Sequence, residues 1–334
     1  MYNITDMRKK ALIYILFLFT CFSLFAQEGK STFDFLLLPT STRSAALGGT
    51  NVSVIEPDIS LVNNNPAFLG AEMDLNFNAT YLAYIADIGM GNITFAKSMG
   101  ERSAWGLGVI YSNYGNMRET TEDKVVLGDL AANDICGNIF VSRDLTEKIR
   151  GGVTAKFMYS NYAHNTALGL GVDLGLSYYD SDKEFSVGLV GKNLGRQVKA
   201  YEEESSSLPW DIQLGVSKKL ANAPLRFSAT GVYLKQWKFD NIDKKEDSFL
   251  KTAGKHLILG VDVIPSDNFW IGLGYNIKRG SDMHLQEGNR LAGFSIGAGL
   301  KVKAFGFGCS FGQYHPSATS FMLNITTSLS EMKL

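Results

Sequence analysis

The sequence HNTALGLGVDLGLSYYD, residues 164–180, alternates apolar residues with glycine and polar residues along most of its length. One phase holds Leu168, Leu170, Val172, Leu174 and Leu176, and the other holds Gly169, Gly171, Asp173, Gly175 and Ser177. A period of two places these sets on opposite faces of a β-strand, and no helix produces it. A soluble sandwich would put charged residues on the second face, where glycine dominates here. We therefore expect a strand that faces lipid on one side and a barrel lumen on the other.

Similar alternating runs recur along the rest of the chain. Each is close to the roughly ten residues that a tilted strand needs to cross a bilayer. An even number of strands returns the chain to its starting edge, and closure removes that edge. The sequence therefore predicts an all-β protein, a closed antiparallel outer-membrane β-barrel over residues 74–334. Its fourteen expected strands are residues 74–84, 88–99, 103–121, 134–145, 148–163, 165–180, 183–195, 209–220, 224–239, 254–265, 268–278, 291–303, 304–314 and 320–329.

The connections between these runs fall into two length classes, as in outer-membrane barrels with short turns on one side and long loops on the other. The short ones are residues 85–87, 146–147, 181–182, 221–223 and 266–267, and the long polar ones are 117–133, 195–208, 240–252 and 279–290. Aromatic residues at the run ends predict interfacial girdles, with core packing in a soluble β protein as the alternative. They are Tyr159, Tyr162, Tyr178, Tyr179, Trp210, Tyr233, Trp237, Phe239, Phe269 and Trp270.

Composition agrees with a membrane barrel. Charged residues make up 19% of the 334 residues, below the roughly 25% of ordinary globular chains, while 34 residues are glycine and 12% are aromatic. A formal net charge of -1 offers no basic field to nucleic acid, so no nucleic-acid partner is expected. Beyond the N-terminus no apolar run reaches the roughly 18 residues of a membrane helix.

The N-terminus resembles a secretory signal peptide over residues 1–26. Arg8, Lys9 and Lys10 form a basic region, residues 11–25 are apolar and uncharged, and Ala26 suits a cleavage site. The alternative is a membrane anchor, for which a core of this length is short. Export by a signal peptide is what an outer-membrane location requires.

Residues 27–73 precede the first strand and show no strand period. Glycine on the inner phase of a strand often marks a place where another backbone approaches closely. We therefore expect this segment to be a hatch that fills the lumen, with a periplasmic tail as the alternative. A buried Arg43 would then need a carboxylate partner, and Asp58, Asp173 and Asp262 are the candidates, unless Arg43 lies in solvent.

Several motifs carry a resemblance to a known family. The stretches FDFLLLP at 33–39 and RSAALGG at 43–49, then Asp58 and NNPA at 64–67, resemble the N-terminal hatch of FadL-like barrels. Together with RGGVTAKF at 150–157, GKNLG at 191–195 and LPWDIQLG at 208–215, they resemble the PorV/PorQ family of the type IX secretion system, the PorQ branch more than PorV. The resemblance covers essentially the whole chain after the signal peptide.

This resemblance implies a fourteen-stranded barrel in the outer membrane of a Bacteroidota-type cell. It implies membership of an attachment complex with PorU, PorV and PorZ, which ties secreted cargo to anionic lipopolysaccharide, and PorQ-like members are expected to hold PorZ. The hatch residues it points to are Arg43, Gly48, Gly49, Asp58, Asn65 and Pro66. The chain departs from many barrels at its end, Glu331-Met332-Lys333-Leu334, where an aromatic residue is the usual assembly signal.

Two polar loops are the expected partner surface. Their charged residues cannot enter lipid, and mixed charge suits an orienting polar rim. Solvated loops without a partner are the alternative. The candidates are Tyr201, Glu202, Glu203, Glu204, Asp240, Asp243, Lys244 and Lys245.

No catalytic or metal motif is complete. Ser248-x-x-Lys251 and Ser266-Asp267-Asn268 match two of the three motifs of penicillin-binding enzymes, but Lys-Thr-Gly is missing. The four histidines are too scattered for a metal motif. Cys136 and Cys309 lie in strand-like runs and are expected to be unpaired packing residues, with a disulfide as the alternative. We expect no enzyme, no cofactor and no metal.

Two functions remain open on the sequence alone. The first is the non-enzymatic attachment-complex component, and the second is a FadL-like transporter of hydrophobic compounds, which would use the same barrel and hatch. An open solute porin would need a charged lumen with little glycine, which this chain lacks.

Overall fold

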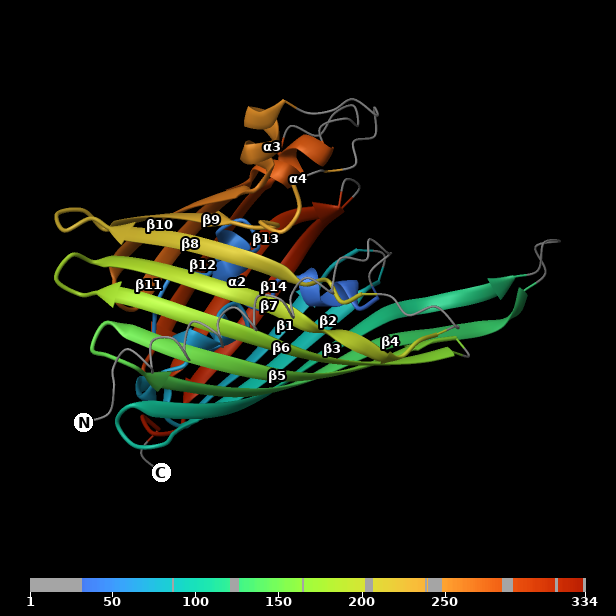
Figure 1. Ribbon diagram of the computed structural model, residues 1–334, viewed down its shortest axis with the longest axis horizontal. Coiled ribbons are helices and arrows are strands. Elements are labelled where there is room, and N and C mark those ends of the chain that lie inside the picture. Colours follow the sequence, from blue (N-terminus) through green and yellow to red (C-terminus); the bar gives the residue numbers. More distant parts are fainter. Residues whose placement is uncertain are drawn as a thin grey trace, which may run out of the picture.

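The computed structural model describes residues 32–85, 87–120, 126–163, 165–201, 207–237, 239, 248–283, 291–315 and 318–332. The expected signal peptide and residues 27–31 lie outside this range. The described strands form one closed barrel in which every strand pairs antiparallel with its sequence neighbours and β1 pairs with β14 (Figure 1). This confirms the predicted closed antiparallel barrel of fourteen strands. Their bounds are β1 Asn76–Ala83, β2 Gly89–Ser98, β3 Ser103–Thr120, β4 Val126–Asp144, β5 Ile149–Tyr162, β6 Asn165–Asp180, β7 Phe185–Lys199, β8 Asp211–Lys219, β9 Leu225–Gly231, β10 Leu257–Ser266, β11 Phe269–Asn276, β12 Phe294–Val302, β13 Phe305–His315 and β14 Ala318–Ser328.

Several strand ends differ from the sequence expectation, and the two largest differences are at the start of β4 and the end of β9. Residues 126–133, in the polar stretch 117–133 expected as a loop, instead belong to β4. Residues 126–131 pair with residues 116–120 of β3, which the expected strand 103–121 already includes, and this paired ribbon projects beyond the rest of the barrel (Figure 1). Outside a bilayer two strands can satisfy each other's backbone groups without an apolar face, so the hydrophobic period gives no warning of such pairing. β9 stops at Gly231 instead of Phe239 because Tyr233 adopts a left-handed φ of 58° and the chain turns away.

The two ends of the barrel are different. Every connection that follows an even-numbered strand is a short turn, and we call this the short-turn end. The opposite, long-loop end carries α3 Phe249–Lys255 and α4 Ile277–Met283, in segments expected to be loops. The connection 85–87, expected among the short ones, follows β1 and therefore belongs to this long-loop end. No helix among the described residues is long and apolar enough to cross a membrane.

The predicted alternation is visible in the burial of β6. Its apolar residues, Leu168 to Leu176 in steps of two, are 37–48% exposed on the outside of the barrel. The intervening glycines and Asp173 are buried on the inside. Because the barrel is closed, the exposed phase forms a continuous apolar outer wall, which suits a lipid environment.

We expect Leu170→Arg to destabilise the barrel by about 2–4 kcal/mol, because it places a charge near the middle of this wall. Leu145→Arg, at a turn of the short-turn end, should cost about 0–1 kcal/mol, because the arginine can reach the interface there. Equilibrium urea unfolding in lipid vesicles would measure both. Equal stability of the Leu170 variant and the wild-type chain would contradict a lipid-facing β6.

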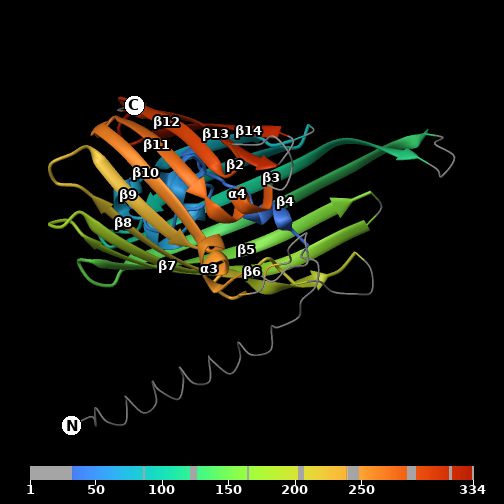
Figure 2. The ribbon, with the colours of Figure 1, turned by 90° about the horizontal axis from the view of Figure 1, so that it is seen from above.

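The barrel encloses residues 32–73, which we call the inner segment (Figure 2). It consists of short helical turns joined by extended backbone: η1 Asp34–Leu37, α2 Thr42–Ala46, η2 Ile59–Asn63, η3 Pro66–Phe68 and η4 Ala71–Met73. Local capping explains these turns, since the Asp58 carboxylate accepts from the Ser60 N–H and the Asn65 side chain accepts from the Ala67 N–H. Gly48 and Gly49 follow α2 with φ near +100°, a conformation that glycine adopts without strain.

The inner segment supplies much of the core that a barrel of this size would otherwise lack. Its buried apolar residues form clusters with inward residues of the wall, for example Phe140 with Met73, and Met158 with Phe33. Cys136 and Cys309 are unpaired, as predicted.

Candidate functional site

Inward glycines of the wall receive the inner segment. A side chain at Gly175 would collide with Asn65 and Pro66, and one at Gly274 would collide with the backbone at Gly48. Gly169 lies 3.0 Å, measured from an ideal Cβ, from the Phe33 ring, and Gly171 lies beside Met158 and Leu208. The inward glycines seen in the sequence therefore lie where the backbone and rings of the inner segment approach the wall closely.

Polar side chains fasten the inner segment to the wall. Thr42 Oγ1 donates to Asn324 Oδ1 at 2.8 Å, and the Gly48 N–H donates to Ser295 Oγ at 2.9 Å. The Asn65 amide donates to the carbonyl oxygen of Leu176 at 3.4 Å. These contacts reach β14, β12 and β6, so the segment is attached around the lumen and not along one side.

The strongest attachment is a buried cluster of two arginines and two carboxylates. Arg226 on β9 donates to Asp262 Oδ2 from Nε at 3.0 Å and from its terminal nitrogen at 2.8 Å. Its other terminal nitrogen donates to Glu56 Oε1 of the inner segment at 2.6 Å. Both Arg226 and Asp262 are almost fully buried. A charge-assisted, hydrogen-bonded link of this kind holds residue 56 to the wall.

Arg43 completes this cluster from α2. Its guanidinium lies 3.7 Å from Asp262 Oδ1 and 3.7 Å from Glu56 Oε1, and it stands 4.9 Å from the centre of the Trp270 ring. Burial raises the pKa of Glu56, but Arg43 and Arg226 together outweigh it and hold that pKa below its ordinary value. Asp262, named from the sequence, is therefore an ion-pair partner of the buried Arg43.

The other two candidate partners of Arg43 make different contacts. Asp58 caps η2, and burial raises the pKa of its carboxyl group. Asp173 pairs with Lys156 at 2.8 Å. Trp270 differs from the girdle expectation: it shares the inward phase of β11, where Gly299 leaves space for its ring.

A bulge in β7 builds a second polar cluster. The β6–β7 register shifts between Val172 and Leu174, and Asn193 takes a left-handed φ of 53°. The Asn193 N–H donates to Asp173 at 2.6 Å, and its side-chain oxygen accepts from Lys156 at 2.6 Å. The neighbouring Lys192 donates to the Asn63 carbonyl oxygen at 2.7 Å. The GKNLG stretch is therefore where the wall bends to hold the inner segment.

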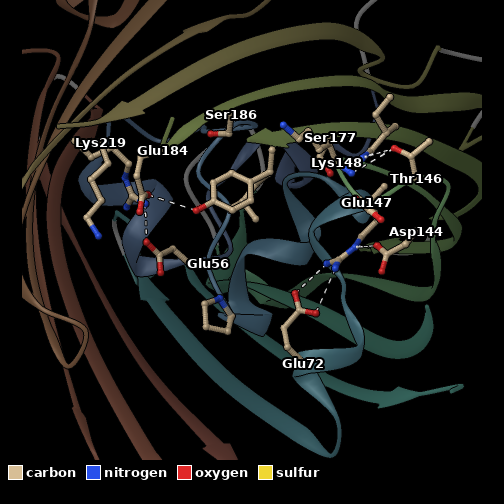
Figure 3. Close-up of a pocket in the computed structure, with 16 residues that line it drawn as sticks. Glu56, Glu72, Asp144, Thr146, Glu147, Lys148, Ser177, Glu184, Ser186 and Lys219 are labelled. Atoms are coloured by element: carbon tan, nitrogen blue, oxygen red, sulfur yellow. Dashed lines mark hydrogen bonds and ion pairs between the residues drawn. The ribbon is translucent and has the colours of Figure 1, made fainter. Parts of the chain in front are cut away.

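A pocket of about 380 Å³ opens between the inner segment and the wall at the short-turn end (Figure 3). On one side Arg150 donates to Glu72 at 2.9 Å and to Asp144 at 2.5 Å. On the other side Glu56 pairs with Arg226. Each acidic residue of the inner segment at this mouth is thus clamped by an arginine of the wall.

The sequence analysis predicted neither of these two ion pairs, Glu56 with Arg226 and Glu72 with Arg150. One signal was available for Arg226, which alternates with Ser228 and Thr230 on the inward phase of β9. The Ser-x-x-Lys and Ser-Asp-Asn matches lie apart, since Ser248 precedes α3 at the long-loop end and Ser266 ends β10 at the short-turn end. Within the described residues no group of three or more His, Cys, Asp or Glu side chains is placed to hold a metal ion.

Of the expected partner-loop residues, Tyr201 is described. Its hydroxyl group hydrogen-bonds to Ser160 beside Asp134, so its ring packs on the wall and not in a free loop. The other seven candidates, Glu202, Glu203, Glu204, Asp240, Asp243, Lys244 and Lys245, lie outside the described residues.

No family model and no curated protein sequence matches the chain. Solved structures do. One structure of the toluene transporter TodX from Pseudomonas putida is 11% identical, with a TM-score of 0.57, covering 88% of this chain and 99% of that one. A FadL homologue from Pseudomonas aeruginosa is 11% identical, with a TM-score of 0.51, covering 87% and 99%. At this identity the likeness shows the fold, that of FadL-like outer-membrane barrels.

Proposed function

We propose that the protein is a non-enzymatic outer-membrane scaffold, a PorQ-like component of the type IX attachment complex that holds a PorZ-like surface protein. PorU and PorV would be its further partners, and lipopolysaccharide the anchor of the cargo. The observation that carries a scaffold role is the attachment of the inner segment. The family-level part of the proposal is supported by the sequence motifs described above.

A scaffold role is supported by a closed barrel whose lumen is occupied by the protein's own residues. Phe33, Phe35 and Leu36 of the inner segment occupy its apolar part, packed on Met158 and Leu208. A cavity between the inner segment and the wall beside Lys192 measures about 70 Å³. An engineered cavity of about 150 Å³ is the size that holds benzene, so this space is too small for such a ligand without movement of the chain. The larger pocket at the short-turn end, about 380 Å³, is lined mostly by charged and polar residues, which does not suit a hydrophobic ligand.

The ribbon formed by residues 116–120 and 126–131 is the described element that best suits a partner. β2 pairs with β3 only as far as Asn113, and β5 pairs with β4 only as far as Ala132. Among the described residues, both outer edges of the ribbon therefore lack a neighbouring strand. An isolated two-stranded ribbon is marginally stable, and its edges can accept a strand from a partner.

Replacing residues 117–130 with Asn-Gly, the sequence of a tight hairpin turn, should abolish retention of the surface partner and leave the barrel folded. The barrel should stay folded because the pairing of β3 with β2, from Asn113 to the short-turn end, does not involve the ribbon. Retention should be lost because the unpaired strand edges are removed. Pull-down from solubilised outer membrane with mass spectrometry would measure retention, and heat-dependent gel mobility would report folding.

A companion variant lacking residues 202–204 and 240–247 tests the two loops that the sequence favoured. If the ribbon variant retained its partner while the companion variant lost it, the partner would dock on those loops instead. If both variants retained the partner as the wild-type chain does, the proposal that the ribbon or these two loops hold the partner would be wrong.

The second candidate function is FadL-like transport of hydrophobic compounds. It is favoured by the fold likeness to TodX, whose structure is described as that of a toluene transporter. Purified protein in liposomes, tested for uptake of a hydrophobic dye with TodX as the positive control, separates the two candidates. A scaffold should give the rate of protein-free liposomes, whereas a rate comparable to that of TodX would favour transport.

A further inference from the structure

The barrel wall is lower on one side than on the other. β8 to β11 contain seven to ten residues each, whereas β3 to β7 contain 14 to 19. On the low side α3 leads directly into β10. Figure 1 shows α3 above the wall formed by β8 to β10, and Figure 2, seen from above, shows it in front of the barrel at the long-loop end of β10.

The free end of α3 is strongly apolar and exposed. Phe249 is 73% exposed and Leu250 is 81% exposed, and both lie in the first turn of the helix. The ring of Trp237, 53% exposed, lies parallel to that of Phe249, with ring centres 6.0 Å apart and planes 5° apart. A contiguous exposed group of this kind is uncommon on a surface that faces only water.

The other end of α3 is fixed to the protein. Lys255 is buried, and its ammonium lies 3.7 Å from Asp282 of α4. The His256 ring stands 4.8 Å from Trp237 and hydrogen-bonds through Nδ1 to the Val232 carbonyl oxygen at 2.8 Å. The helix therefore holds its apolar end in a set position, outside the barrel.

The apolar outer wall is continuous with α3. Leu257, the first residue of β10, and Leu259 are both exposed on the outer wall. Only His256 separates α3 from Leu257. A helix of seven residues is about 10 Å long, so Phe249 and Leu250 lie within roughly that distance of the wall's upper edge. Lys235 and Lys251 are exposed beside this apolar group, and Lys235 lies 4.4 Å from the centre of the Trp210 ring.

We propose that Trp237 and the first turn of α3 form a membrane contact that lies at the headgroup–acyl boundary of the outer leaflet. The occupant of this apolar surface is the leaflet in which the barrel itself sits. Tryptophan and lysine together are typical of that depth, where the ring enters the boundary and the ammonium groups reach the phosphates. This contact seals the low side of the wall, and it is independent of whether the barrel acts as a scaffold or a transporter.

Tryptophan fluorescence tests this directly, because the chain has only four tryptophans. In a variant with Trp105, Trp210 and Trp270 replaced by phenylalanine, Trp237 is the single reporter. In vesicles of lipids brominated high on the acyl chain, Trp237 should lose fluorescence to a similar degree as the single tryptophan of a Trp105-only variant. Trp105 shares the outward phase of β3, so its quenching also establishes that the barrel is inserted. Acrylamide in the water should quench Trp237 weakly.

The double substitution Phe249→Ser and Leu250→Ser should reduce quenching of Trp237 by the brominated lipid and increase quenching by acrylamide. Leu145→Ser, at the short-turn end, is the matched control and should change neither. Strong acrylamide quenching of Trp237 without lipid quenching would overturn the proposal, because the ring would then lie in water. Protection from both quenchers would also overturn it, because protein would then cover the ring.

Discussion

Gly188→Val will destabilise the barrel by about 3 kcal/mol or more and release the inner segment from its place. A Cβ at Gly188 would overlap the backbone carbonyl of Val52, and a backbone cannot rotate away as a side chain can. Overpacking of a buried site generally costs about 1–3 kcal/mol, and a collision with backbone belongs at the top of that range or above it. Urea unfolding in vesicles measures the stability, and limited proteolysis between residues 32 and 73 measures release.

The matched control is Gly137→Val, on the outward phase of β4. An added Cβ there would meet no atom within 4 Å, so the same chemical change should leave stability and protease resistance nearly unchanged. If both variants behaved alike, the inner segment would not press on the wall at Gly188, and the picture of a filled lumen would have to be abandoned.

The second large effect is expected at the buried charge cluster. Arg226→Met leaves Asp262 and Glu56 without the arginine to which they are hydrogen-bonded, and Arg43, 3.7 Å from each, makes no hydrogen bond that would replace it. Removing one partner of a buried ion pair costs about 3–5 kcal/mol, because the remaining charge stays buried without compensation. The double variant Arg226→Met with Asp262→Leu should recover a large part of this loss.

The exposed ion pair of Lys301 and Glu331 provides the control for these substitutions, since the two side chains are each 48% exposed and lie 3.1 Å apart. An exposed ion pair contributes about 0–1 kcal/mol, so Lys301→Met should have little effect. Unfolding in urea at low and high salt gives both measurements. A loss for Arg226→Met no greater than that for Lys301→Met would show that the cluster does not hold the inner segment.

The strands were predictable because their environment repeats. A wall between lipid and lumen enforces a period of two at every strand, and β6 shows it without interruption. The inward glycines and Asp262 were likewise predictable from their phase. The β4 half of the ribbon was not, because residues 126–131 pair with residues 116–120 beyond the barrel, where no apolar face is required. α3 was missed for a related reason, since seven residues are too few to show a helical period.

The charged contacts of the inner segment were predictable only in part. Burial of Arg43 requires a carboxylate, and the sequence offered Asp262 by its phase. Glu56 lies in a stretch without any period, so nothing in the sequence places it against Arg226. Trp270 was wrongly assigned to the interfacial girdle because an aromatic residue at a strand end can face either the lumen or the interface. Its pairing with Gly299 on β12, which leaves space for the ring inside the barrel, becomes visible only in the structure.

The position of the inner segment has a consequence for how the barrel is assembled. Thr42 lies 282 residues before its hydrogen-bond partner Asn324 on the last strand, which itself pairs with the first strand through Thr80. Closing a chain loop of this length is slow compared with forming neighbouring hairpins. Because the closed wall encloses this segment, we expect it to be in place before that last seam forms. The N-terminal residues would then serve as a template for the hairpins, and β14 would find its register against α2 as well as β1.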